Sequence, residues 1–149
     1  MNTTTGSAKA AETAERNIHT MRRIYEEAFG EGKLDILDEC FAPDIVNHTA
    51  PEPYRVGIEP VRGLIEMLRT AFPDARTEIE HMVADGDAVV MRNWYAGTHQ
   101  GPFMGHEPTG RPFRFRQMHW MRFDDEGRVA EHWGVRDDMA HLRQLGVIG

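Results

Sequence analysis

The spacing of apolar residues changes near residue 75, and this change constrains the fold more than any other feature of the chain. Before that point, apolar residues recur every three or four positions, which is typical of amphipathic helices. After it, they alternate with polar residues, which is typical of β-strands with one buried face. Helices that come first and strands that follow through tight turns predict an α+β domain with a largely antiparallel sheet.

The first half of the chain is expected to contain three amphipathic helices. Each has apolar residues along one side and ends at glycine or proline, because glycine is flexible and proline cannot continue a helix. These helices cover residues 18–29, 33–42 and 58–72. A short strand over residues 44–48 lies between the second and the third.

The second half is expected to contain four strands, joined largely by hairpins. The sequence Asp85-Gly86-Asp87 is a tight turn between the first two strands. The strands cover residues 75–83, 88–99, 114–123 and 128–137, and a short helix over residues 138–146 closes the chain. We expect this antiparallel sheet to be strongly curved, to wrap around the helices and to leave a cavity between them.

The chain has 149 residues, which fits one domain with a single core. Residues 1–12 are polar and rich in alanine, and we expect them to form a flexible tail. Residues 13–149 are then expected to form the single domain, because no internal repeat or second core is visible.

Charge and composition limit the partners and the location. The formal net charge is −7, which argues against nucleic acid or a membrane surface as a partner, because both reward basic patches. Cys40 is the single cysteine, so no intrachain disulfide forms. No signal peptide or membrane-spanning run is visible, and we expect a cytoplasmic protein.

The motifs that usually hold cofactors are missing from the sequence. It has no zinc-ligand spacing, no phosphate-binding glycine loop and no dinucleotide fingerprint. Its eight histidines lie in separate elements and show no ligand spacing. We therefore expect any chemistry to use side chains alone, without a metal or a cofactor.

Polar residues interrupt the apolar face of the strand over residues 114–123. Alternation places Phe115, Gln117, His119 and Met121 on the same face. An amide and an imidazole among large apolar groups are typical of a pocket wall. The alternative is structural: His119 is a core histidine bonded to backbone, and Gln117 is a buried amide satisfied by a loop.

Four segments of the chain together match a family pattern: "FPDARTEIEHMVADGDAVVMRNWYAGTHQGPFMGHEPTGRPF", "QMHWMRF", "EHW" and "LRQLG". They resemble the SnoaL-like polyketide cyclases of the nuclear-transport-factor-2-like superfamily, and the resemblance extends from about residue 14 to the end. The Gly-Thr-His-x-Gly-Pro-Phe-Met-Gly part is the most specific. The resemblance implies a cone-shaped α+β barrel, a curved antiparallel sheet around the N-terminal helices, and a central apolar cavity.

The resemblance also implies an activity in secondary metabolism. It is an intramolecular aldol condensation that closes a ring of an aromatic polyketide methyl ester, without metal or cofactor. The family's pocket uses an asparagine, a glutamine, a histidine and an aspartate; Asn47, Gln117 and His119 match the first three. The aspartate, the family's acid/base, falls at Gly134, and glycine cannot transfer a proton.

The departure at Gly134 leaves the acid/base to other residues. We take His119 and His132 as the candidate catalytic residues, because imidazole titrates near working pH. Glu131 and Asp137 are the other candidates near this position. The expected substrate-binding residues are Asn47 and Gln117, which hold a carbonyl or hydroxyl, with apolar walls of Phe115, Met121, Trp94 and Phe103 for a small apolar or aromatic ligand.

Two other functions stay open from the sequence. One is a different acid/base reaction in the same pocket, of the epoxide hydrolase, dehydratase, isomerase or hydroxylase type. The other is non-catalytic binding of a small apolar ligand. On the opposite face of the sheet, apolar residues predict a homodimer or a higher homo-oligomer, because such a face is usually covered: Met118, Trp120 and Trp133.

Overall fold

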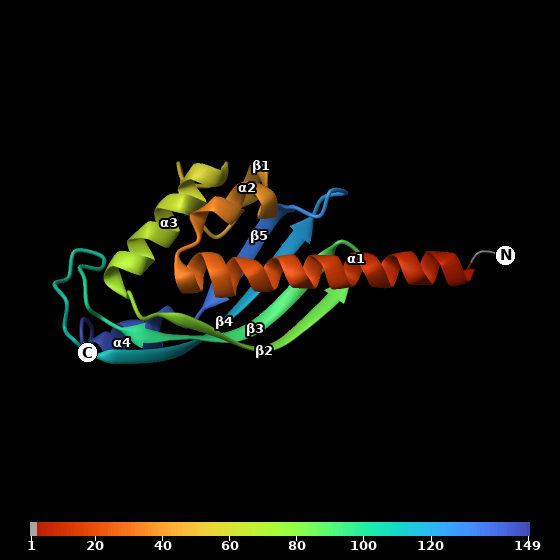
Figure 1. Ribbon diagram of the computed structural model, residues 1–149. Coiled ribbons are helices and arrows are strands. Elements are labelled where there is room, and N and C mark those ends of the chain that lie inside the picture. Colours follow the sequence, from red (N-terminus) through yellow and green to blue (C-terminus); the bar gives the residue numbers. More distant parts are fainter. Residues whose placement is uncertain (1–2) are drawn as a thin grey trace.

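A five-stranded sheet with helices packed against one of its faces makes up the computed structural model, which describes residues 3–149 (Figure 1). The strands are β1 (Phe41–Asn47), β2 (Arg76–Asp85), β3 (Ala88–Thr98), β4 (Pro112–Phe123) and β5 (Val129–Arg136). The α-helices are α1 (Thr3–Arg23), α2 (Leu37–Cys40), α3 (Ile58–Ala71) and α4 (Asp138–Leu145). A π-helical turn, η1 (Ile24–Phe29), continues α1, and a 3₁₀ turn, η2 (Leu34–Ile36), precedes α2.

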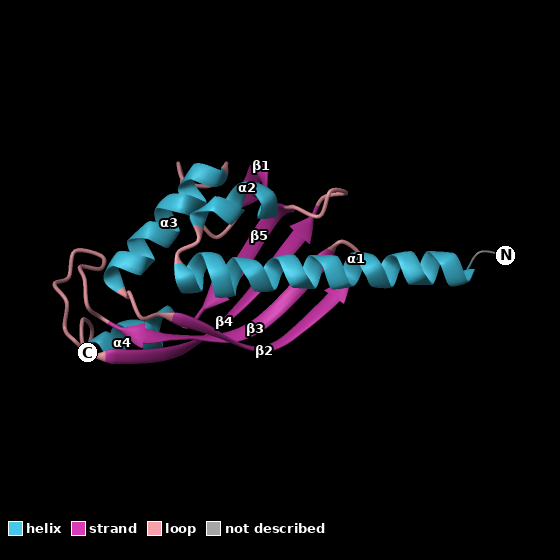
Figure 2. Cartoon of the chain, in the orientation of Figure 1, coloured by secondary structure: helices cyan, strands magenta, loops and turns pink. Residues whose placement is uncertain are grey.

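The strands lie in the order β1-β5-β4-β3-β2. The four strands from β2 to β5 pair antiparallel, as the turn sequences predicted. β1 pairs with β5 in parallel, which a hairpin cannot produce but the long connection through α3 and three strands allows. The predicted α+β class, with a curved sheet around the helices, is confirmed (Figure 2).

Helix α1 begins at Thr3, so most of the segment expected to be a flexible tail over residues 1–12 is helical. Residues 1–2 lie outside the described part. The reason is local composition, because Ala8, Ala10 and Ala11 have the highest helix propensity of all residues. The first turns of α1 extend beyond the edge of the sheet (Figure 1), and their side chains from residue 5 to residue 12 are exposed.

Two apolar clusters fill the space between the helices and the sheet. The main core cluster joins α1, η1 and α3 to the inner face of β3, β4 and β5, and it includes Met21, Ile24, Ile65, Met91 and Phe123. The aromatic cluster lies nearer to α4 and includes Phe72, Tyr95, Phe113, Phe115 and Leu145. On β4, residues alternate strictly between buried and exposed up to Met121, so the predicted inner face is the one that meets the helices.

No helix within residues 3–149 is both long enough and apolar enough to cross a membrane.

The loop after β3 is attached to the end of α3 through Gly101, and we expect this contact to be sensitive to one methyl group. The Gly101 N–H donates to the Ala71 carbonyl at 2.9 Å. A Cβ at Gly101 would overlap the Thr70 carbonyl oxygen. We expect Gly101→Ala to lower the free energy of unfolding by about 1–3 kcal/mol in urea titrations.

Gly63→Ala is the matched control for this substitution. Gly63 lies inside α3, and a Cβ there meets no atom within 4 Å. It should raise the free energy of unfolding by up to about 1 kcal/mol, because alanine favours helix. Equal effects of the two substitutions would contradict the close approach of the loop to α3.

Candidate active site

Five polar side chains from four strands form one continuous hydrogen-bonded chain on the inner face of the sheet. We call it the polar chain, and it consists of Asn93, Gln117, His119, His132 and Asn47. Asn93 Nδ2 lies 3.1 Å from Gln117 Oε1, which lies 3.0 Å from His119 Nε2. His119 Nδ1 lies 2.9 Å from His132 Nε2, and His132 Nδ1 lies 2.8 Å from Asn47 Oδ1.

The register of the sheet explains why these residues meet. Gln117 faces Asn93 across the β3–β4 ladder, and His132 faces Asn47 across the parallel β1–β5 ladder. His119 faces Gly134 on β5. Because side chains on one strand face recur every two residues, His132 lies beside Gly134 on the same inner face.

Gly134 leaves room for the two imidazoles to touch. A Cβ at this position would lie 3.2 Å from His119 Nδ1 and 3.2 Å from His132 Cε1. These distances are tighter than ordinary carbon contacts, so any side chain at Gly134 would press on both rings. The direct contact between His119 and His132 therefore depends on the absence of a side chain at Gly134.

Asn47 fixes the proton positions on His132. The Thr49 N–H donates to Asn47 Oδ1 at 3.1 Å, so the end of the amide that faces His132 is the oxygen. His132 must therefore donate its Nδ1–H to Asn47, and in the neutral ring its Nε2 carries the lone pair. His119 then donates its own Nδ1–H to His132 Nε2, which leaves the second nitrogen of His119, Nε2, as an acceptor when that ring is neutral.

The protonation of His119 is coupled to the orientation of the Gln117 amide. A protonated His119 donates from Nε2 to the amide oxygen, whereas a neutral His119 needs the amide NH₂ at that place. When Gln117 presents its NH₂, a turned Asn93 amide accepts from it through Oδ1, an atom that is otherwise buried without a partner. The chain can thus take up or release one proton by turning two amides.

Burial and neighbouring charges keep both imidazoles neutral near pH 7. Burial holds the pKa of His119 well below its ordinary value, and the charges of His132 and Arg136 lower it further. Burial also lowers the pKa of His132 to about 4, with smaller contributions from Arg136 and His48. A neutral imidazole in such a site is a base, and no carboxylate belongs to the polar chain.

Two residues near the polar chain were not singled out from the sequence. The Tyr25 ring lies 4.7 Å from the His119 ring, and its burial raises the pKa of its hydroxyl. Tyr25 belongs to the π-helical turn η1. The spacing of apolar residues in the predicted first helix did not indicate that Tyr25 contacts β4. Arg136 faces Gln117 across the β4–β5 ladder, and its shared parity with His132 was a signal that could have identified it.

The predicted wall residues are divided between the two faces of the sheet. Phe115 and Met121 are buried on the inner face, and Phe103 packs against Phe72 with ring centroids 4.9 Å apart. Trp94 lies on the outer face, contrary to the prediction, with the Arg114 and Arg116 guanidinium carbons 3.9 and 4.2 Å from its ring centroid. Alternation along β3 places Asn93 and Tyr95 on the inner face. Trp94 lies between them and therefore faces the other side, so its assignment to the pocket wall was wrong.

The two acidic candidates lie away from the polar chain. Glu131 contacts His48 Nε2 at 2.8 Å and Arg122 Nε at 2.7 Å, and it shares the outer parity of β5. Asp137 caps α4 by accepting the Ala140 N–H at 3.1 Å. Within residues 3–149, no group of three or more His, Cys, Asp or Glu side chains is arranged to hold a metal ion.

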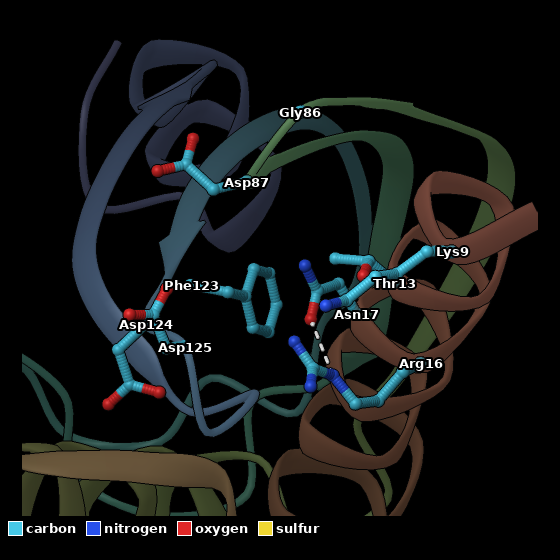
Figure 3. Close-up of a pocket in the computed structure, with 9 residues that line it drawn as sticks. All are labelled: Lys9, Thr13, Arg16, Asn17, Gly86, Asp87, Phe123, Asp124 and Asp125. Atoms are coloured by element: carbon cyan, nitrogen blue, oxygen red, sulfur yellow. Dashed lines mark hydrogen bonds between the residues drawn. The ribbon is translucent and has the colours of Figure 1, made fainter. Parts of the chain in front are cut away.

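A surface hollow of about 300 Å³ lies between α1 and the turns of the two hairpins (Figure 3). In this hollow Arg16 Nε donates to Asn17 Oδ1 at 3.3 Å, opposite the Phe123 ring. A smaller hollow of about 190 Å³ lies where the end of β3 and the start of β4 meet the start of β2. Neither hollow is lined by a residue of the polar chain, which lies beneath Tyr25.

Comparison with known proteins shows the family of the chain. The family model described as SnoaL-like polyketide cyclase matches residues 19–145. The chain belongs to the SnoaL-like polyketide cyclase family. Its relative in Streptomyces peucetius, aklanonic acid methyl ester cyclase DnrD, is 31% identical over 132 residues, covering 87% of this chain and 90% of the relative.

Solved structures of the SnoaL-like fold superpose on most of the chain. IdmH from Streptomyces antibioticus, provisionally named a polyketide cyclase, is 35% identical with a TM-score of 0.76, covering 87% of this chain and 98% of IdmH. AclR from Streptomyces galilaeus, provisionally named a hydroxylase, is 31% identical with a TM-score of 0.76, covering 94% of this chain and 99% of AclR. The same fold therefore carries proteins with more than one assigned chemistry.

Protonation of the buried pair should make the stability of the protein depend on pH. In the unfolded chain a histidine titrates near 6.5, whereas the folded pKa of His132 is about 4. Between these values the unfolded state binds protons that the folded state does not, so the free energy of unfolding falls as pH drops from about 6.5 to about 4. The loss from His132 is expected to reach up to about 3 kcal/mol.

Urea titrations of wild type and His132→Gln at several pH values test this expectation. The variant should lose less stability than wild type over the same interval, and His106→Gln, which changes an exposed loop histidine, should follow wild type. The same pH dependence in His132→Gln and wild type would show that the ring does not titrate in the way its burial implies.

Proposed function

We propose that this protein is a cofactor-independent cyclase that closes a ring of an aromatic polyketide ester by intramolecular aldol condensation. The observation that carries the proposal is the direct contact of His119 Nδ1 with His132 Nε2 at 2.9 Å, beside the glycine that stands at the position of the family's aspartate. Membership of the family and the likeness to an aklanonic acid methyl ester cyclase support the substrate class.

The reaction needs a base for an acidic C–H and donors for the oxygen that becomes negative. In the proposed sequence, the neutral pair of His119 and His132 takes a proton from a carbon next to a carbonyl, which leaves an enolate. The enolate carbon attacks a second carbonyl of the same molecule, one C–C bond forms, and the carbonyl π bond becomes an alkoxide. The alkoxide takes the proton back from the imidazole pair, so the protein ends unchanged.

Residues around the imidazole pair complete this proposal. A turned Gln117 amide directs its two hydrogens to His119 and Asn93, so Gln117 can follow the proton on the pair without leaving an unmatched hydrogen bond. Tyr25 contributes a hydroxyl donor and a ring that covers His119. Phe115 and Met121 are buried and Phe103 is partly buried, so the surroundings of the site are apolar, which suits an aromatic skeleton.

A second candidate function is a hydroxylase-type reaction in the same site. AclR motivates it, because that protein is similar over 94% of this chain. The glycine at position 134 also motivates it, since the residue that defines the acid/base of the cyclases is absent. Oxygenated products without ring closure would favour this function, and tight binding of an aromatic ligand with no product would favour a non-catalytic binder.

We further propose that the protein is a homodimer formed through the outer face of the sheet. Met118, Trp120 and Val135 are 50%, 52% and 76% exposed there, which is unusual for so many large apolar groups on one face. Beside them, Arg114 pairs with Glu78 at 2.8 Å, so the face also carries both signs of charge. A second copy related by a twofold axis matches an apolar strip with itself and positive groups with negative ones. A cytoplasmic location stays a prediction.

Ring closure by the purified protein tests the proposed function. An anthraquinone-type methyl ester precursor is incubated with wild type, and the product is separated by chiral chromatography. We expect an enantiomeric excess and a rate that persists to about pH 5, because burial holds the pKa of His132 at about 4. His119→Gln should lower kcat by about a hundred- to ten-thousand-fold.

His81→Gln, on the exposed edge strand β2, is the control for this assay and should leave the rate unchanged. Gly134→Asp extends the comparison, because its carboxylate would enter between the two imidazoles. Ring closure by Gly134→Asp alone would mean that the scaffold is a cyclase without its acid, and that the imidazole pair does not replace it. An unchanged rate in His119→Gln would also exclude the proposed role of the pair.

The oligomeric state in solution tests the dimer. Light scattering coupled to gel filtration should give twice the chain mass of 17.0 kDa. Trp120→Glu should give the monomer mass, because it buries a charge in the proposed interface. Met67→Glu, which places the same charge on the exposed side of α3, should remain a dimer. A monomeric wild type would refute the interface.

A further inference from the structure

Arg136 stands at the edge of the inner face, where β5 ends and α4 begins. The β4–β5 register places it opposite Gln117, in the same parity as Gly134 and His132. Its side chain is 39% exposed, and its Nε lies 3.3 Å from Asp138 Oδ1. A half-exposed ion pair of this kind is weak, so Asp138 leaves the guanidinium free to bind another anionic group.

The positive charge of Arg136 acts on the inner face rather than only on solvent. It contributes to lowering the pKa of His119 and of His132, and it opposes the effect of burial on Tyr25. It also lowers the pKa of His141, which lies on α4. Gln117 lies opposite Arg136 on β4 and Asp138 pairs with it, while Tyr25, His119, His132 and His141 are the titratable groups on which its charge acts.

Among these groups, Asp138 is the only carboxylate, and it lies outside the polar chain on the first turn of α4. The inner side of the site thus has a guanidinium, neutral imidazoles and neutral amides. A fixed positive charge beside buried neutral groups stabilises negative charge that develops on a ligand oxygen.

We infer that Arg136 is the oxyanion-binding residue of this site, with its guanidinium on the enolate or phenolate oxygen of an aromatic polyketide. This inference rests on the proposed function for its substrate class and deepens it, because it names the residue that makes the C–H acidic enough for a neutral imidazole. Arg136 then has two opposite effects on the proton transfer. It makes the protonated form of the imidazole pair less stable, and it stabilises the anion that the base creates.

An anthraquinone dye with an ionisable phenol, such as 1,2-dihydroxyanthraquinone, reports on Arg136 without any turnover. Its absorbance distinguishes phenol from phenolate, so its pKa can be measured free and bound. We expect binding to wild type to lower the pKa of the dye by about 1 to 3, because an opposite charge within contact distance favours the ionised form. Arg136→Gln should abolish this change, and Arg136→Lys should keep part of it.

Two controls separate a specific contact from a general charge effect. Arg143→Gln removes an exposed guanidinium from α4 and should leave the pKa of the bound dye as in wild type. Asp138→Asn releases Arg136 from its partner and should keep or increase the effect. Failure of the dye to bind wild type, or an equal pKa in wild type and Arg136→Gln, would overturn the inference.

The outcome is independent of ring closure. A lowered dye pKa that depends on Arg136, in a protein that closes no ring, would retain the oxyanion site and reject the cyclase reaction. Ring closure with an unchanged rate in Arg136→Gln would retain the cyclase reaction and reject the oxyanion role of Arg136. If both hold, Arg136→Gln should lower kcat for ring closure by about a hundred- to a thousand-fold, as the loss of an oxyanion donor does elsewhere.

Discussion

The contact between His119 Nδ1 and His132 Nε2 is the interaction on which the rest of the inner face depends. It joins two strands side by side in the sheet, and it exists because Gly134 has no side chain to separate the rings. Asn47, held by the Thr49 N–H, then sets the tautomers of the two rings, and the orientation of the Gln117 amide follows the protonation of His119. The hydrogen bonds thereby couple the proton of the site to the orientation of the Gln117 and Asn93 amides.

The resemblance to the family implies that Gly134 stands in place of a carboxylate, and this has a physical consequence beyond the loss of one acid. A carboxylate beside His119 and His132 would favour their charged forms, whereas burial without it favours the neutral ones. The pair is therefore a base at neutral pH, with Arg136 as the nearby positive charge on the inner face. In our proposal, the imidazole pair carries the acid/base function and Arg136 carries the anion stabilisation, so the two functions reside on different side chains.

Much of the fold and part of the site followed from the sequence. The alternation on residues 114–123 identified the buried face of β4, and with it Gln117 and His119, because the side-chain period of a strand is two. Asn47 and His132, which the sequence offered as site residues, lie within hydrogen-bond distance although they are 85 positions apart. Trp94 was assigned to the wrong face because it is as large and aromatic as a core residue. This residue type was given more weight than the alternation of side chains along the strand.

The sequence by itself determined the order of helices and strands, the antiparallel hairpins and the identity of the inner face of β4, because all of these depend on local spacing. Only the tertiary structure decided that β1 joins β5 in parallel, that Tyr25 covers His119, and that the two imidazoles touch. These contacts join residues distant in the chain, and they depend on a π-helical turn, a crossover and an absent side chain. None of those leaves a periodic signal, since each is fixed by packing rather than by neighbours in sequence.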